Sequence, residues 1–333
     1  MDWGSIFSNT MSAVIGWEVV AYALAAIGLN IHFGYTGLLN FGQAGFMAIG
    51  AYGVAMGIST FGLSLPVAFL FAVAFTVLLA LLLGVPTLRL RADYLAIVTL
   101  AAAEIIKLFF RSAALSEHTG GSDGLQGRPP FVNGFRALSP YEQTSYSVGP
   151  FDINGNTLFV ITVGWVVIAL GTLLVWLLMR SPWGRVLKGI REDEEAVRSL
   201  GKNVFAYKMQ SLIIGGLFGA LAGMVFAFAQ ASANPDNFSP QTTFFAYTVL
   251  ILGGAARVFG PIAGSIIFWA SLVFIENFLF QAIAAGYVPS ALMDSTQASQ
   301  VRFILVGVVL MLLMIYRPQG IFGDKRELQL DAR

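Results

Sequence analysis

The chain is built from long apolar stretches separated by polar connections. Nine stretches come near or exceed the roughly 20 apolar residues that a helix needs to cross the hydrocarbon core of a bilayer. They lie at about 14–33, 37–58, 63–85, 94–111, 157–179, 207–230, 243–257, 261–283 and 301–316. The runs are continuous rather than alternating, which favours helices over a transmembrane barrel. The pattern therefore predicts an all-α, polytopic integral membrane protein with about nine transmembrane helices.

The seventh stretch, 243–257, is short for a crossing and runs into Gly253-Gly254. A half-helix that turns back fits this pattern, so the number of crossings lies between about eight and ten, with broken or re-entrant segments. Residues 1–333 are interpreted as a single transmembrane domain. Its polar parts are an external loop (112–156), a charged segment (181–208) and a C-terminal tail (317–333).

The composition is also typical of a membrane protein, and it argues against several classes of function. Hydrophobic residues make up 57% of the chain and charged residues 11%, with a mean hydropathy of +0.76; soluble domains carry about 25% charged residues. Zero cysteines and two histidines exclude thiolate metal sites and disfavour a histidine-ligated metal. The phosphate-loop and common catalytic motifs are also missing from the sequence. The sequence predicts no enzymatic activity, no metal site and no cofactor bound by this chain. Membrane lipid, and not nucleic acid, is expected around it.

Basic residues are distributed unevenly among the connections. With the N-terminus outside and the C-terminus inside, nine crossings place most of the 19 Lys and Arg residues on the cytoplasmic side, as the positive-inside rule requires. The predicted cytoplasmic set is Arg89, Arg91, Arg180, Arg185, Lys188, Arg191, Arg198, Lys202, Lys208, Arg257 and the basic residues of the tail. No Lys or Arg precedes Arg89, so the first stretch lacks the basic region of a secretory signal and is expected to be retained.

The charged segment reads SPWGRVLKGIREDEEAVRSLGKNVFAYK, with an acidic cluster followed by basic residues. A short helix is predicted from Arg185 or Glu192 to Leu200, with Gly201 as its C-terminal stop. Val197 and Leu200 are expected on one face of this helix. One interpretation is a solvated loop that satisfies the positive-inside rule. The other is a docking element for a partner, which the acidic cluster and the terminal glycine favour.

Glycines interrupt several apolar stretches. The patterns Gly215-x-x-x-Gly219-x-x-x-Gly223 and Gly260-x-x-x-Gly264 allow helix backbones to approach closely. A second interpretation is a broken helix whose freed backbone groups line a transport path, and the polar, glycine-dense opening of the second stretch suits it. The residues predicted to line such a path are Asn40, Gly42, Gln43, Gly45, Gly253 and Gly254.

Among the charged residues within the predicted spans, Glu104, Lys107 and Glu276 are the ones considered for function. Glu104 and Lys107 are three positions apart on one helix, so they are expected to pair, with Lys107 reaching toward the outer surface. Glu276 has no local partner in the sequence. Charges inside a bilayer are costly, which makes each of them a candidate functional group.

Several motifs resemble one family. Glu195-Ala196-Val197, three residues and Gly201 are similar to the EAA-three-residues-Gly signature of bacterial ABC-importer permeases, with Val197 at the usual second Ala. A wider set of blocks resembles the branched-chain amino-acid ABC importer family, in its LivM-type permease subunit. The blocks are GYTGLLNFGQAGFMAIGAY (34–52), LRLRADYLAIVTLAAAEI (88–105), TGGSDGLQG (119–127), RSPWGRVLKGIREDEEAVRSLGKNVFAYK (180–208), LGGAARVFGPIAGS (252–265) and YRPQGIFG (316–323). They occur in family order. Asn40 and Gln43 depart from the Ser and His common in that family.

The resemblance implies a transmembrane permease subunit that moves branched-chain or other apolar amino acids across the bacterial inner membrane by alternating access. Urea or short amides are the further substrates of the wider family. Implied partners are a second homologous permease, two ATP-binding subunits that carry ATP and Mg, and an external solute-binding protein received by the TGGSDGLQG stretch. The residues expected to form or shape the ATPase contact are Arg191, Glu192, Asp193, Glu194, Glu195, Ala196 and Gly201. The alternative is an ion-coupled secondary transporter or channel that works without an ATPase and depends on Glu104 or Glu276.

Overall fold

The computed structural model describes residues 2–89, 92–126, 129–141, 144–148, 151–287, 295–317 and 319–323. The predicted cytoplasmic Arg91, the external Arg128 and the tail beyond Gly323 lie outside them. The main helices are α1 (Trp3–Ile15), α2 (Trp17–Leu29), α3 (Gln43–Ser59), α4 (Leu65–Thr87), α5 (Ala92–Arg111), α8 (Gly155–Arg180), α11 (Val204–Gln230), α12 (Pro240–Gly253), α13 (Gly260–Ala284) and α14 (Ser295–Tyr316). A π-helix, η1 (Asn30–Tyr35), continues α2.

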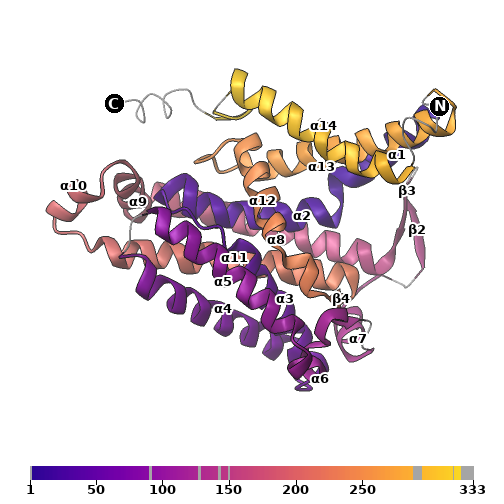
Figure 1. Cartoon of the computed structure of the whole chain (residues 1–333). Helices are drawn as coiled ribbons and strands as arrows, with labels where there is room; N and C mark the ends of the chain where they lie inside the picture. Colours follow the sequence, from indigo (N-terminus) through magenta and orange to yellow (C-terminus); the bar gives the residue numbers. More distant parts are fainter. Residues whose placement is uncertain are drawn as a thin grey trace.

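Short elements lie at the two ends of these long helices (Figure 1). One end carries α9 (Pro182–Glu192) and α10 (Glu194–Ser199). The other end, here called the loop end, carries the remaining short elements. These are α6 (Ser116–Thr119), α7 (Pro129–Arg136), β1 (Leu125–Gln126), β4 (Ser232–Ala233) and the hairpin β2 (Ser145–Val148) and β3 (Phe151–Asn154), together with the 3-10 helices η2 (Ala113–Leu115), η3 (Gly121–Asp123) and η4 (Pro235–Phe238). Strands β1 and β4 pair antiparallel, which joins the predicted external loop to the connection after α11.

Five helical stretches are long and apolar enough to cross a membrane: Trp3–Tyr35, Leu65–Thr87, Gly155–Arg180, Val204–Gln230 and Gly260–Ala284. Four of them contain a predicted stretch in full, and Leu65–Thr87 contains all but the first two residues of 63–85. The predicted stretches 94–111 and 301–316 correspond to α5 and α14, which have 20 and 22 residues. The all-α, polytopic class is therefore confirmed.

The two remaining helices are short. Helix α3 has 17 residues and α12 has 14. At 1.5 Å per residue they span about 26 and 21 Å, less than the roughly 30 Å of a hydrocarbon core. The prediction of a helix beginning near residue 37 was wrong by several residues, because irregular backbone precedes Gln43. Helix α12 ends at the predicted glycine pair, Gly253-Gly254. The prediction of broken segments is confirmed at both places.

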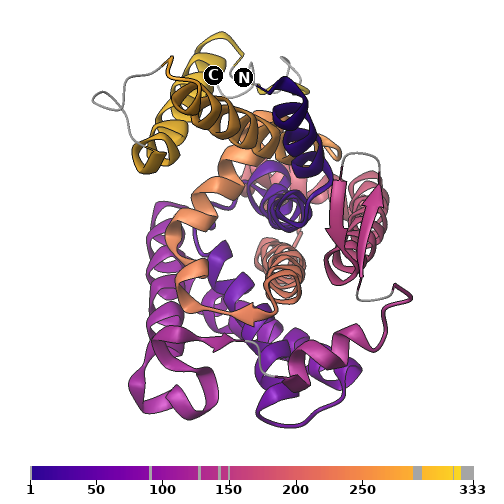
Figure 2. The same cartoon turned by 90° about the vertical axis from the view of Figure 1, so that its right-hand side faces the viewer.

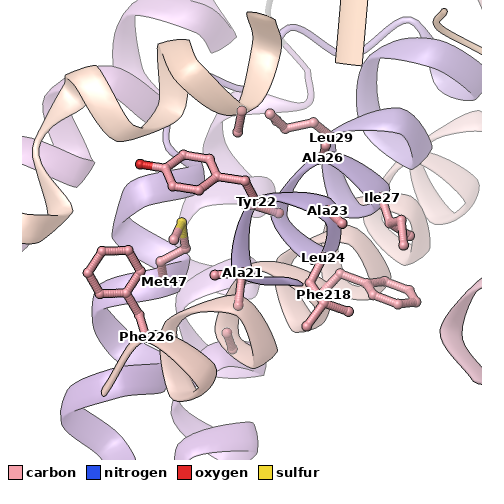
Figure 3. Close-up of a cluster of buried hydrophobic side chains, with 14 of the residues drawn as sticks. Ala21, Tyr22, Ala23, Leu24, Ala26, Ile27, Leu29, Met47, Phe218 and Phe226 are labelled. Carbon is pink, nitrogen blue, oxygen red and sulfur yellow. The ribbon is translucent and has the colours of Figure 1, made fainter. Parts of the chain in front are cut away.

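Helix α2 is the centre of the bundle (Figures 2 and 3). Every residue from Val19 to Leu29 is buried, and α2 contacts α3, α8, α11, α12 and α13. Figure 3 shows Met47 of α3 and Phe218 and Phe226 of α11 gathered around it. The alanines of α2 leave room for these larger side chains, so neighbouring helices pack against α2 on every side.

The helices around α2 and α11 repeat one arrangement in opposite directions. Helix α2 runs toward the α9–α10 end, whereas α11 starts there (Figure 1). Helices α3 and α4 follow α2 but pack on α11, and helices α12 and α13 follow α11 but pack on α2. An Asn-Phe pair and a small N-cap residue precede each short helix, Asn40-Phe41-Gly42 before α3 and Asn237-Phe238-Ser239 before α12. The bundle therefore contains two halves in opposite orientation. The short helix of each half packs on the long helix of the other, α3 on α11 and α12 on α2.

Glu104, Lys107 and Glu276, the span residues considered for function, are all in ion pairs. Lys107 Nζ lies 2.6 Å from Glu104 Oε1, which confirms the predicted pair. The expectation that Glu276 lacks a partner holds only along its own helix, because Arg302 of α14 forms an ion pair with it. Burial of an unpaired carboxylate is costly, and the partner comes from the next helix in the chain.

Candidate functional site

Irregular backbone at residues 37–42, called here the break segment, joins η1 to α3 inside the bundle. Asn40 within it and Gln43 just after it are fully buried. Asn40 Nδ2 lies 3.1 Å from His32 Nδ1, and Gln43 Nε2 donates to the carbonyls of Ala25 (3.2 Å) and Gly215 (3.3 Å). These bonds tie the break segment to η1, α2 and α11.

His32 is fully buried at the centre of this polar cluster. Its Nε2 lies 3.2 Å from the carbonyl oxygen of Leu212, which can only accept a hydrogen bond. The proton is therefore on Nε2, and Nδ1 accepts from Asn40. His32 was not among the predicted path residues. Its spacing of eight residues from Asn40 gives no signal in the sequence, because the chain reversal brings the two side chains together.

Side chains from α5 and α12 satisfy the backbone of the break. The Phe41 amide donates to Thr99 Oγ1 (3.0 Å), and the Ala44 amide donates to Thr243 Oγ1 (2.9 Å). The Tyr247 hydroxyl donates to the Asn40 carbonyl at 3.0 Å. Irregular backbone at membrane depth is tolerated only when protein or water satisfies it, so these bonds explain how the break is held.

Glycines let the neighbouring helices close on this segment. A Cβ added at Gly42 would lie 2.6 Å from the Thr99 carbonyl, and one at Gly45 would lie 3.2 Å from the Cα of Ala103. Gly28 and Gly219 leave the space that the Gln43 side chain occupies between α2 and α11. Gly42 and Gly45 thus pack against α5, while Asn40 and Gln43 supply the polar groups.

Aromatic rings cover the break segment on its outer side. The Phe41 ring packs against Phe244 and Tyr247, with centroids 5.6 and 5.0 Å away. Tyr247 also meets Phe33 edge-on at 5.8 Å. Phe244 is about half exposed, so an apolar aromatic surface lies directly outside the polar cluster.

Gly253 and Gly254 belong to a different place, the turn between α12 and α13. A Cβ at Gly253 would lie 1.8 Å from the Gly260 carbonyl, and Gly254 has a φ of +109° beside Gly323. Asn30 holds this turn: its Oδ1 accepts from the Ala256 amide and its Nδ2 donates to the Arg257 carbonyl, both at 2.8 Å. The structure therefore divides the six predicted path residues into two groups.

The charged segment folds as two helices rather than one. Asp193 ends α9 and caps α10, with its Oδ1 accepting from the Ala196 amide at 3.0 Å. Val197 is buried, whereas Leu200, which follows the last residue of α10, is 78% exposed. Gly201, the predicted stop, has a φ of +75°. The predicted start at Arg185 was wrong, because α9 ends at Glu192, whereas the alternative start at Glu192 lies two residues before the start of α10.

The acidic cluster is divided between internal and outward contacts. Glu194 forms ion pairs with Arg198 and with Lys208 of α11, so it braces α10 against the bundle. Among the described residues, Glu195 forms an ion pair with Arg198 on the same helix alone, and it is largely exposed. Glu192 and Ala196 are also exposed, so these positions, with Leu200, form the outward face of the segment.

Arg191 points inward instead. Its Nη1 donates to the Gly34 carbonyl at 2.6 Å, and its side chain also covers Gly37 at the start of the break segment. Lys188, one turn earlier on α9, lies over the Tyr35 ring at 5.8 Å. The α9–α10 pair is thus anchored directly on the end of η1 and on the break segment.

Known membrane permeases are similar to this chain over most of its length. The family described as the permease component of branched-chain amino acid transport systems matches residues 13–316. The high-affinity branched-chain amino acid transport system permease protein LivM of Escherichia coli K12 is 31% identical over 92% of this chain and 68% of LivM. The corresponding permease protein LivH of the same strain is 24% identical over 91% of both chains.

A relative with a different named cargo is the nucleoside ABC transporter permease protein NupC of Lactococcus lactis, 26% identical over 76% of both chains. No solved structure gives a significant match. The match to the family covers both halves of the bundle, the break segment and the α9–α10 pair. The chain belongs to the branched-chain amino acid transport system permease family of membrane proteins.

Proposed function

We propose that this chain is the permease subunit of an ATP-driven importer for branched-chain or other apolar amino acids in the bacterial inner membrane. Family membership supports the permease role, and the names of the two E. coli relatives support the substrate class. The NupC relative makes a nucleoside the competing substrate in any uptake test.

One observation carries the proposal. Arg191, on the exposed α9–α10 pair, is bonded to Gly34 at the end of η1, directly before the break segment. A pair of short helices projects from the bundle and is braced by Glu194 and Lys208. This arrangement suits a docking element through which movement of a bound partner displaces η1 and the break segment.

The partners follow from the same reasoning. E. coli has two permease proteins, LivM and LivH, of one transport system, so a second homologous permease is expected beside this chain. Two ATP-binding subunits would carry the ATP and Mg, with no cofactor on this chain. One of them would dock on Glu192, Glu195, Ala196 and Leu200, and the other on the second permease. An external solute-binding protein would meet the loop end. The N-terminus is outside and the C-terminus cytoplasmic in this arrangement.

In this proposal, alternating access arises from a conformational change at the break segment. ATP binding moves α9–α10, and Arg191 transmits this to η1 and to the turn that Asn30 holds. Asn40, Gly42, Gln43 and Gly45 come to line the path as the break opens. The aromatic surface of Phe41 and Phe244 suits an apolar substrate.

The ion-coupled alternative has less support. Such carriers need an ionisable group near the middle of the membrane that binds and releases the coupling ion. Glu104 and Glu276 are each held in an ion pair by Lys107 and Arg302. The chain offers a protein partner to both carboxylates, which favours a structural role for them.

Capture of ATPase subunits tests the proposal. The chain is co-expressed with candidate ATPases and purified through a tag, comparing wild type with Leu200→Asp plus Glu195→Arg. Leu138→Asp, an exposed leucine at the loop end, is the matched control. We expect wild type and control to retain the ATPases and the double variant to lose them. Wild-type protein that binds no ATPase and transports without ATP would contradict the proposal.

A further inference from the structure

A cationic cavity lies at the α9–α10 end, between α8, α9 and the α12–α13 turn. Its volume is about 480 Å³. The cationic side chains in its wall are Arg180, Lys188 and Arg257, and no Asp or Glu lines it among the described residues. The N-terminus of the 25-residue helix α13 also borders it at Gly260. A cavity with several cations and a long helix N-terminus attracts a phosphate group.

Arg180 and Lys188 are available for such a group. Neither forms an ion pair with a described residue. The Arg180 guanidinium instead stacks at 3.9 Å over the Trp176 ring, which leaves its N–H groups free to point sideways toward a ligand. Trp176 lies one turn before Arg180, so the stacked guanidinium reaches back along α8 in the direction of the membrane.

An apolar groove of about 580 Å³ adjoins this cavity along α8 and α13. Trp176 and Phe259 line both spaces, so the groove continues from the cationic cavity. Its wall is apolar apart from Thr172, whose buried hydroxyl has no partner among the described residues. A polar hydrogen in an otherwise apolar groove is suited to an ester carbonyl.

We propose that these two spaces form one binding site for an anionic glycerophospholipid. The phosphate of the headgroup lies between Arg180 and Lys188, an ester carbonyl accepts from Thr172, and one acyl chain fills the groove between α8 and α13. A free phosphate would use the cavity but not the groove, and a zwitterionic lipid would bring a positive group next to the cations. The bound lipid joins α9 to the α12–α13 turn, the same elements that Arg191 and Asn30 connect to η1.

Placing this lipid in the cytoplasmic leaflet rests on the proposed importer topology, whereas binding itself does not. The test is therefore a binding measurement without transport. The full chain is purified in detergent, and retained lipid is measured by native mass spectrometry after adding phosphatidylglycerol, phosphatidylcholine or soluble glycerol phosphate. We expect phosphatidylglycerol to be retained at least about fivefold better than phosphatidylcholine, on the order of the effect of one basic residue near an anionic headgroup.

Two pairs of variants divide the site. Arg180→Gln plus Lys188→Gln should abolish the preference, and Arg185→Gln plus Lys202→Gln, which removes two exposed cations outside the cavity, should keep it. Ala169→Trp should fill the groove and lower retention with the cations intact, whereas Leu170→Trp, on the neighbouring exposed position, should not. Equal retention of the two lipids would overturn the proposal, as would glycerol phosphate competing as well as the lipid or Ala169→Trp having no effect.

Discussion

Arg191 of α9 donates a hydrogen bond of 2.6 Å to the main-chain carbonyl of Gly34, 157 positions earlier in the chain. In a continuous helix this carbonyl would accept from the amide of residue 38. Here the Leu38 amide bonds to the His32 carbonyl instead, at 2.8 Å, because the helix ends and the chain turns back. The break in the helix thus frees the acceptor through which α9 is bonded to the end of η1.

Replacing Arg191 should separate ATPase binding from transport. We expect Arg191→Gln to retain the ATPase subunits and to lose at least about tenfold in transport per bound ATPase, since a hydrogen bond to a charged group contributes about 1.5–3 kcal/mol. ATP-dependent uptake, normalised to captured ATPase, measures this. Arg185→Gln, on the exposed side of the same helix, is the control and should keep normal uptake. Loss of ATPase binding in Arg191→Gln alone would show that this arginine is a docking residue.

Close packing between α3 and α11 should make Gly223 intolerant of a side chain. A Cβ there would lie 1.9 Å from the Met47 carbonyl. We expect Gly223→Ala to lower the free energy of unfolding by about 1–3 kcal/mol, the usual cost of overpacking. Thermal unfolding in detergent reports the change. Gly307→Ala is the control, because nothing lies within 4 Å of a Cβ at that position. Identical melting of the two variants would argue against this packing.

The hydroxyl of Thr99 should be needed for the break segment itself. Thr99→Val removes the acceptor of the Phe41 amide in a partly buried hydrogen bond, which should destabilise the protein by about 1–3 kcal/mol. Thr162→Val changes an exposed threonine whose hydroxyl bonds to the Leu158 carbonyl of its own helix and, at 3.5 Å, to the Tyr141 hydroxyl, and should have little effect. Hydrogen exchange of peptides covering 37–46 localises the result, and faster exchange in Thr99→Val alone is expected. Unchanged exchange in this region would contradict the assignment.

Substitution of Glu104 and Glu276 tests whether transport is driven by ATP or by an ion gradient. In an ATP-driven importer, Glu104→Gln and Glu276→Gln should each keep at least about a third of wild-type uptake, because partly exposed ion pairs contribute only up to about 1 kcal/mol. Uptake into proteoliposomes with and without an ion gradient measures this. Complete loss of uptake in a variant that folds and binds the ATPases would favour ion coupling.

Apolar runs in the sequence predicted the long helices well, because a segment that crosses a bilayer must satisfy its backbone hydrogen bonds within itself. Apolar runs such as 157–179 and 261–283 became α8 and α13 with only small changes at their ends. The Glu104–Lys107 pair was also predictable, since three positions on one helix bring two side chains together. These features depend on local spacing alone.

The remaining features depend on contacts between distant parts of the chain. Arg302 as the partner of Glu276 comes from another helix, and Asp193 divides the charged segment because its carboxylate caps α10. His32 enters the polar cluster only because the chain reverses at the break. The two inverted halves share a sequence feature, an Asn-Phe pair before α3 and another before α12. This repeat can be recognised only once the structure shows that a short helix follows each pair.

The most direct measurement is uptake of labelled leucine into proteoliposomes that contain this chain with a second permease, the ATPase subunits and a binding protein. We expect uptake that requires ATP, survives collapse of ion gradients, and is competed by other branched-chain amino acids but not by a nucleoside. Uptake by this chain alone, driven by an ion gradient without ATP, would contradict the proposed function and direct attention to Glu104 and Glu276.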